Sequence, residues 1–346
     1  MLRDSSPAAA VLLVPAFLGL LAFPLFGADF YVQLFAKIMI LAILAMSLNL
    51  LVGFAGLVSL GHAAFFGLGA YALVFTSTGA EAANLWTTLP LAVGASAAAA
   101  LVIGALVLRT SGVYFIMATL AFAQMLYYLF HDGKFAGGSD GVYVYVKPAA
   151  ELFGVGRIDL ESRTAFYYVT LTVLALVYIL LRITMQSLFG RVLAGIRVNE
   201  HRMRALGYPT FRYKLVAFTA SGGLAGLAGY LAGAQFGFVT PEQLGWHLSG
   251  EALVMIILGG MGTLFGPVLG AFGFVFLQEL TMEITDHWPL LMGGFIILMV
   301  LAFPNGLSDA LLDLVEHWRM FRRPSPPSQG AQPAPQPAGG AGGGAS

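Results

Sequence analysis

The sequence contains no cysteine and, for a chain of 346 residues, very little charge. Without cysteine there is no disulfide, no thiolate ligand for a metal and no cysteine nucleophile. Only 10% of the residues are Asp, Glu, Lys or Arg, whereas 58% are hydrophobic. One soluble core does not bury so much apolar surface, but bilayer hydrocarbon solvates it. We therefore expect an integral membrane protein.

The sequence also lacks the patterns of nucleotide and metal chemistry. It has no GxxxxGK[ST] phosphate loop, and its one Gly-Lys pair, at 133–134, is followed by Phe. The six histidines are scattered along the chain and do not form a cluster with carboxylates that could hold a metal. A membrane-embedded enzyme is therefore disfavoured. We predict no catalytic residue, no metal, no cofactor and no nucleic-acid partner.

Apolar runs of membrane-spanning length fill most of the chain. Dividing it at charged and turn-rich points predicts an all-α polytopic membrane protein with about ten transmembrane helices. The eighth span is short and the third is rich in glycine, so eight or nine spans with re-entrant segments are the alternative. The predicted spans are 8–26, 33–52, 57–77, 88–108, 112–131, 165–184, 213–233, 249–262, 264–283 and 289–304.

The two ends of the chain are expected to differ from this membrane domain, which we place at 8–306. The first apolar run resembles a signal peptide, but no small-x-small cleavage site follows it, and we interpret it as a retained span. Residues 1–7 then form a short N-terminus. Residues 307–346 form a tail, and its Pro-, Ala- and Gly-rich part from about 324 is predicted to be disordered because it cannot bury a core.

The distribution of charge predicts the orientation. Twelve of the seventeen cations fall in loops on one side, which the positive-inside rule makes cytoplasmic, together with both termini. The opposite side holds an external loop at 132–164, whose cations are balanced by acids. Its "GGSDG" stretch (137–141) is interpreted as a tight turn, with contact to a binding protein as the alternative. The largest cytoplasmic loop is 185–213.

This cytoplasmic loop contains "GRVLAGIRVNEHRMRALGYPTFRYK" (190–214), with six cations and one carboxylate. The spacing predicts one amphipathic helix over 191–207, ended by Gly207 and Pro209. Glu200 and Arg204 are placed for an i to i+4 ion pair. The helix either lies on anionic lipid or docks on a cytoplasmic partner. Its apolar side is predicted to hold Val192, Ile196, Met203 and Leu206 with Asn199 among them, and its polar side Arg197, Glu200, His201 and Arg204.

Glycine concentrates in two segments of corresponding halves of the chain, Gly53 to Gly69 and Gly259 to Gly273. Paired glycine-interrupted segments are typical of transporters whose broken helices frame a path, although glycine also permits close helix packing. We interpret the GxxxG pairs within 222–233 as packing. His62 either contacts a solute or caps a helix break. The candidate path residues are Ser59, His62, Gly67, Thr119, Gln124, Gly259 and Gly262.

Several stretches together resemble the permeases of branched-chain amino acid ABC importers, most closely the LivM type. They are "LNLLVGFAGLVSLGHAAFFGLGAYA" (48–72), "GGSDGV" (137–142), "RYKLVAF" (212–218) and "ILGGMGTLFGPVLGA" (257–271). In "NEHRMRALGY", Glu200 and Gly207 match the Glu-Ala-Ala loop of importer permeases. His201 and Arg202 depart from that pattern, since they stand where the two alanines are expected.

This resemblance implies a bacterial inner-membrane permease subunit with broken, glycine-rich helices. Its partners would be a second homologous permease, two ABC ATPase subunits and a periplasmic substrate-binding protein. It would import leucine, isoleucine and valine, and the same permease type also serves urea, short amides and other amino acids. Arg197, Glu200, His201, Arg204 and Gly207 would couple to the ATPase. The alternative is an ion-coupled secondary transporter, which requires mid-span ionisable residues that are scarce here.

Overall fold

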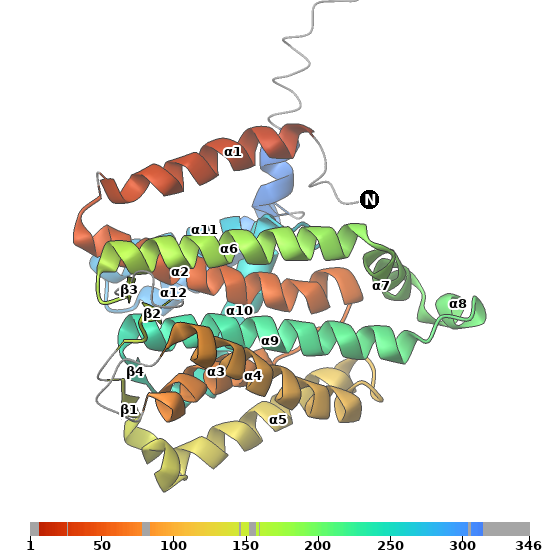
Figure 1. The fold of residues 1–346 in the computed structure, drawn as a ribbon. Coiled ribbons are helices and arrows are strands. Elements are labelled where there is room, and N and C mark those ends of the chain that lie inside the picture. The colour runs from red at the N-terminus through yellow and green to blue at the C-terminus, as the bar shows by residue number, and fades with distance from the viewer. Residues whose placement is uncertain are drawn as a thin grey trace, which may run out of the picture.

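The computed structural model describes residues 7–25, 27–77, 84–144, 147–151, 157–158, 160–303 and 306–313, and this part of the chain is almost entirely helical (Figure 1). The predicted ends 1–6 and 314–346 lie outside the described residues. The longer helices are α1 (Pro7–Ala22), α2 (Asp29–Asn49), α3 (His62–Thr76), α4 (Leu85–Val107), α5 (Val113–His131), α6 (Arg163–Gln186), α7 (Leu188–Val198), α9 (Thr210–Phe236), α10 (Trp246–Gly259), α11 (Gly266–Ile284) and α12 (Trp288–Ala302).

Short elements join these helices. A π-helical segment, η3 (Leu50–Ala55), continues α2, and α8 (Glu200–Ala205) follows α7. The 3-10 turns are η2 (Phe23–Leu25), η4 (Lys134–Ala136), η5 (Gly138–Asp140) and η6 (Pro241–Leu244). Two antiparallel pairs of very short strands complete the fold. They join β1 (Val142–Tyr143) to β4 (Phe238–Val239) and β2 (Ala150–Glu151) to β3 (Arg157–Ile158).

A helix lies over each of the ten predicted spans, which confirms the polytopic all-α class. Within the described residues, six helices are long and apolar enough to cross a bilayer, or seven if α12 and the helix Leu307–Asp313 form one bent span. Three more apolar helices are shorter: Val14–Leu25, α3 and α10. The third span was predicted to begin at residue 57, but its helix begins at His62, because the chain turns at Gly56, where φ is +70°.

The helix formed by α2 and η3 lies at the centre of the bundle and is 94% buried over its most apolar stretch, against 22% for α5. In Figure 1, α1 and α5 lie at opposite edges with α2 and α9 between them. The glycines of α9 allow it to approach its neighbours closely. A Cβ on Gly222, Gly226 or Gly229 would collide with Ala100, Ser96 or the carbonyl of Phe66, respectively. The packing interpretation of these GxxxG pairs therefore fits the structure.

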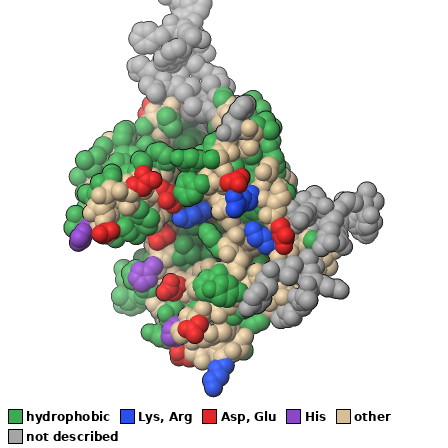
Figure 2. Space-filling view, turned by 90° about the vertical axis from the view of Figure 1, so that its left-hand side faces the viewer, with side chains coloured by type: hydrophobic (Ala, Val, Ile, Leu, Met, Phe, Trp, Pro, Cys, Tyr) green, Lys and Arg blue, Asp and Glu red, His purple; other side chains and the backbone are tan. Residues whose placement is uncertain are grey.

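The two loops expected on opposite sides of the membrane lie at opposite ends of the bundle (Figure 1). The four short strands gather at one end, and α7 and α8 project from the other. Figure 2 shows the strand end, where acidic and basic side chains are interspersed among hydrophobic ones. Here the "GGSDG" stretch is a turn, with Gly137, Gly138 and Gly141 at positive φ. Loops 132–164 and 185–213 thus lie at opposite ends of the bundle, and the side of the membrane that each faces stays a prediction.

The folded part of the chain extends past the predicted end of the membrane domain at 306. Residues 307–313 form a helix in which Ser308 and Leu312 are buried. The hydroxyl of Thr263 donates to that of Ser308 over 3.2 Å. The first residues assigned to the tail therefore pack against the segment between α10 and α11.

Candidate functional site

Loop 185–213 contains two helices, so the prediction of one continuous helix over 191–207 is wrong. The break is at Asn199, whose φ of −159° and ψ of 100° are extended. Its side-chain oxygen accepts a hydrogen bond from the Arg202 N–H over 2.9 Å and so caps α8. Asparagine is among the preferred residues for this capping position, and here the preference outweighs the apolar periodicity. Asn199 does not lie on an apolar face.

The apolar residues of the loop are divided between the protein interior and an exposed tip. Val192 and Ile196 of α7 are buried as predicted, and Met203 of α8 packs back toward Gly195. Leu206 was predicted to join them but is 66% exposed, and Val198 is 85% exposed. His201 and Arg202 are exposed between these two residues. We call Val198, His201, Arg202 and Leu206 the loop tip.

The carboxylate of Glu200 contacts three side chains of α8 and α9. Its carboxylate accepts hydrogen bonds from Arg204 at 2.6 Å, as predicted, and from the Thr210 hydroxyl at 3.0 Å, and it lies 2.9 Å from the ammonium of Lys214. Burial raises the pKa of Glu200, but the hydrogen bonds from Lys214 and Arg204 and the charge of Lys214 outweigh it, so the net shift is downward. This cluster fastens α8 to the start of α9.

Gly207 ends α8, as predicted. Its φ is +86°, its N–H donates to the Arg204 carbonyl, and the Tyr208 N–H donates to the Met203 carbonyl. This pair of hydrogen bonds is the Schellman arrangement, in which glycine is favoured because an L side chain is strained at positive φ. The space around Gly207 is open, so the backbone conformation alone requires glycine here.

Arg197 is exposed like the loop tip, but its guanidinium reaches the membrane helices. Its Nη1 donates a hydrogen bond to the carbonyl of Gly53 in η3. A Cβ built on Gly56 would lie 3.0 Å from the Cγ of Arg197, and one on Gly262 would lie 3.4 Å from Nη1. The arginine side chain therefore lies against both glycine-rich breaks.

The two glycine-rich segments meet in space. The first break, 56–61, separates η3 from α3, and the second, 260–265, separates α10 from α11. The side-chain amide of Asn49 donates to the Thr263 carbonyl over 2.8 Å. A Cβ on Gly53 would lie 2.9 Å from the backbone nitrogen of Gly262. The sequence pairs these segments by their position in the chain, but its pattern does not point to Asn49.

His62 lies at the first break, as the first residue of α3, and is fully buried. Its Nε2 is 2.9 Å from the Ser47 hydroxyl and 3.3 Å from that of Ser221, and Ser221 donates to the Ser47 carbonyl. The cluster joins α2, α3 and α9. Neither serine is among the residues predicted from the sequence, although both are rare polar groups in apolar spans, the same signal that points to Ser59.

The other candidate path residues are mostly enclosed by the protein. Ser59 is buried and accepts from the Gly61 N–H, and Thr119 of α5 accepts from the Leu60 N–H, both over 3.3 Å. A Cβ on Gly67 would meet Leu244, and one on Gly259 would meet the Gly266 carbonyl. Gln124 is half-buried elsewhere on α5. The structure gathers Ser59, His62, Thr119 and Gly262 around the breaks, and the role of all seven residues in a path stays a prediction.

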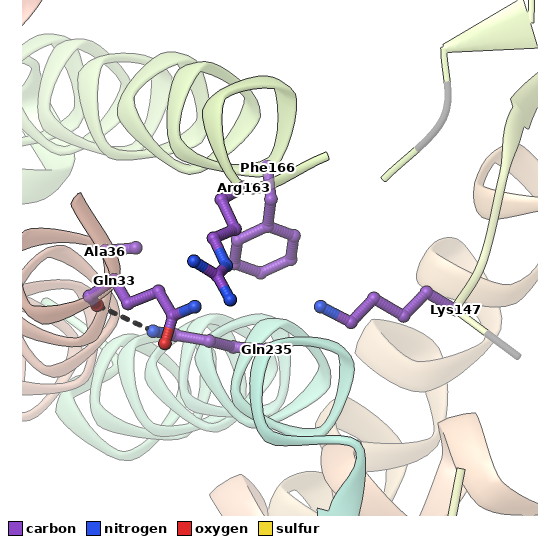
Figure 3. Close-up of a pocket in the computed structure, with 6 residues that line it drawn as sticks. All are labelled: Gln33, Ala36, Lys147, Arg163, Phe166 and Gln235. Atoms are coloured by element: carbon purple, nitrogen blue, oxygen red, sulfur yellow. Dashed lines mark hydrogen bonds between the residues drawn. The ribbon is translucent and has the colours of Figure 1, made fainter. Parts of the chain in front are cut away.

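A pocket of about 30 Å³ opens between α2, α6 and α9 near the strand end (Figure 3). Gln235 donates to the Gln33 carbonyl over 2.8 Å at its floor, and Arg163 and Lys147 point into it. Arg163 also pairs with Asp29 at 2.7 Å. Burial lowers the pKa of Lys147 while the charge of Glu161 opposes this shift. From the sequence these cations are expected to be loop charges balanced by acids, and no pattern there predicts a pocket.

The chain is similar in sequence to known permease proteins. Residues 30–303 match the family described as the permease component of branched-chain amino acid transport systems. The chain is 34% identical over 289 residues to the high-affinity branched-chain amino acid transport system permease protein LivM of Salmonella typhimurium, and 32% identical to that of Escherichia coli. Each alignment covers 78% of this chain and 68% of the relative.

A second group of relatives matches a shorter part of the chain. The autoinducer 2 import system permease protein LsrC of Salmonella paratyphi B is 31% identical over 151 residues, which cover 41% of this chain and 43% of that protein. No solved structure is significantly similar to the chain.

Proposed function

The chain belongs to the permease family of branched-chain amino acid transport systems, and we propose that it is one transmembrane subunit of an ATP-driven importer for leucine, isoleucine and valine. The relatives named for branched-chain amino acid transport support this substrate class. Other amino acids, urea or short amides are the alternative substrates. The LsrC relatives mark a further branch whose solute is different.

The observation that carries the proposal is the loop tip. Val198 and Leu206 are exposed apolar side chains at the end of the bundle that the charge distribution assigns to the cytoplasm, and His201 and Arg202 lie between them. Exposed apolar side chains at either end of a short projecting helix, with polar groups between them, are suited to a groove on a partner protein. The shape of the loop that presents this surface is held by Arg197, Glu200, Arg204 and Gly207.

In the proposed mechanism, ATP binding to two ATPase subunits moves the loop tip and alternates access to a path shared with a second permease. A periplasmic binding protein delivers the solute at the strand end. Both termini lie in the cytoplasm of a bacterial cell, and the chain crosses the inner membrane ten times, with α3 and α10 as short spans beside the two breaks. These breaks provide the flexible points that broken helices give transporters.

An ion-coupled secondary transporter is the second candidate, because an ion pair lies between two of the spans well inside the sequence of α2. Lys37 of α2 lies 3.5 Å from Glu279 of α11, and both side chains are about one-third exposed. Charged pairs within membrane helices often belong to ion pathways. The pair has the features of an ordinary surface ion pair, which is why the importer is preferred.

The experiment is uptake into proteoliposomes that contain this subunit with its partner permease and ATPases. Labelled leucine should accumulate only when ATP and the binding protein are both present, and isoleucine and valine should compete for it. Urea and acetamide serve as competitors for the alternative substrates. Uptake by this subunit alone, driven by an ion gradient and independent of ATP, would overturn the proposal in favour of the secondary transporter.

A further inference from the structure

We propose that Arg197 transmits movement of loop 185–213 to the two glycine-rich breaks and does not itself bind the ATPase. This inference rests on the proposed function, because it presumes that a partner moves the loop. It assigns Arg197 a positioning role that the sequence did not indicate, since an amphipathic helix places this arginine on the same polar face as Glu200 and His201.

The side chain of Arg197 reaches both glycine-rich breaks. Arg197 stands in the last turn of α7, and its guanidinium donates to the Gly53 carbonyl. It also lies beside Gly262, 65 residues away along the chain. Gly56 and Gly262 have φ of +70° and +88°. Because glycine has no Cβ, the aliphatic and charged parts of the arginine approach both backbones closely.

The positive charge of Arg197 lies near the C-terminal ends of two helices. Gly53 lies in the last turn of η3, where backbone carbonyls have no partner within the helix. The second break follows directly after α10, which ends at Gly259. The C-terminal end of a helix carries partial negative charge, so a guanidinium between two such ends is favoured. Arg197 therefore stabilises both breaks together, in addition to the hydrogen bond between Asn49 and Thr263.

Loop 185–213 is attached to the membrane helices at two places. α8 is fastened to α9 through Glu200, Thr210 and Lys214, whereas α7 reaches the breaks through Arg197. The loop tip lies between these two attachments. A rotation of the tip and α7 about the attachment to α9 would consequently displace the guanidinium, the Gly53 carbonyl and the segment around Gly262 together.

The test uses the complete complex in proteoliposomes, with Arg197→Gln and Arg197→Lys. Arg191→Gln is the control, because Arg191 is an exposed arginine on the same helix. Three quantities are measured: the ATPase that co-purifies, the rate of ATP hydrolysis, and the solute imported per ATP. We expect Arg197→Gln to retain the ATPase and hydrolyse ATP but to import at least about tenfold less solute per ATP. Lysine should restore part of this loss, and Arg191→Gln should match wild type.

A second measurement is independent of the ATPase. Amide hydrogen exchange in the isolated, folded subunit should become faster in segments 53–62 and 260–265 with Arg197→Gln, and should stay unchanged with Arg191→Gln. The inference is overturned if exchange at both breaks is unaffected, or if Arg197→Gln loses uptake only in proportion to lost ATPase. A wild-type chain that binds no ATPase would count against the proposed function alone, since the exchange experiment still decides the role of Arg197.

Discussion

Glu200 is the only carboxylate between Arg182 and Leu215, and it is the anion for a buried lysine. The Lys214 side chain is only 7% exposed, against 28% for Glu200. Removing only the counter-ion of a buried ammonium lowers the stability of a protein more than replacing both charged groups. The carboxylate therefore holds the loop in shape, and the partner surface that we propose lies elsewhere, on the loop tip.

Glu200→Gln should lower the free energy of unfolding by about 1–3 kcal/mol, because it leaves Lys214 without its anion. Thermal unfolding of the purified subunit measures this loss. Arg202→Gln, on the exposed side of the same helix, should stay within about 0.5 kcal/mol of wild type. The double variant Glu200→Gln with Lys214→Met should lose less than Glu200→Gln alone. Equal losses in the Glu200 and Arg202 variants would contradict this account.

The pH dependence follows from the lowered pKa of Glu200. A carboxyl with a lower pKa in the folded state stabilises the fold above its ordinary value of 4.5, and this stabilisation is lost as the pH falls through the folded value. The difference in stability between wild type and Glu200→Gln should be constant near neutral pH and shrink in acid below 4.5. A difference that grew in acid would show that the carboxylate is not the stabilising form.

At the scale of the elements, the spans were predictable and the breaks between them only partly so. Membrane helices follow from runs of about twenty apolar residues, and those runs are explicit in the sequence. The break at Asn199 was missed because the apolar spacing continues on both sides of it. The junction of Asn49, Gly53 and Thr263 depends on residues more than 200 positions apart, which no local pattern specifies.

The close approach of α9 to α3 at Gly229 predicts how the stability responds to an added side chain. Gly229→Ala should destabilise the packing of α9 on α3 by about 1–3 kcal/mol, because its Cβ would overlap the Phe66 carbonyl. Gly94→Ala in α4 is the matched control, since a Cβ there meets nothing within 4 Å. It should leave stability unchanged or raise it by up to about 1 kcal/mol. Thermal unfolding distinguishes the two, and similar effects for both would contradict close packing at Gly229.

At the scale of the whole molecule, the two ends of the bundle differ in the chemistry they present. The strand end carries interspersed charges and the pocket formed by Lys147 and Arg163 (Figures 2 and 3). The opposite end projects α7 and α8 with an exposed apolar pair. The distribution of charge predicts which loops share a side. It does not predict that Arg197 and Glu200 contact the rest of the chain while the loop tip is free of such contacts within the described part of the chain, because this depends on how α7 and α8 pack on η3 and α9.

The most direct test of the importer account is co-purification of the partner subunits with this chain in mild detergent. The variant is Val198→Asp with Leu206→Asp at the loop tip, and Ser139→Asp in the loop at the strand end is the control. Wild type and the control should retain both the second permease and the ATPase, whereas the loop-tip variant should retain the permease and lose the ATPase. An ATPase that stays bound to the loop-tip variant, or that never binds the folded wild-type chain, would contradict the account.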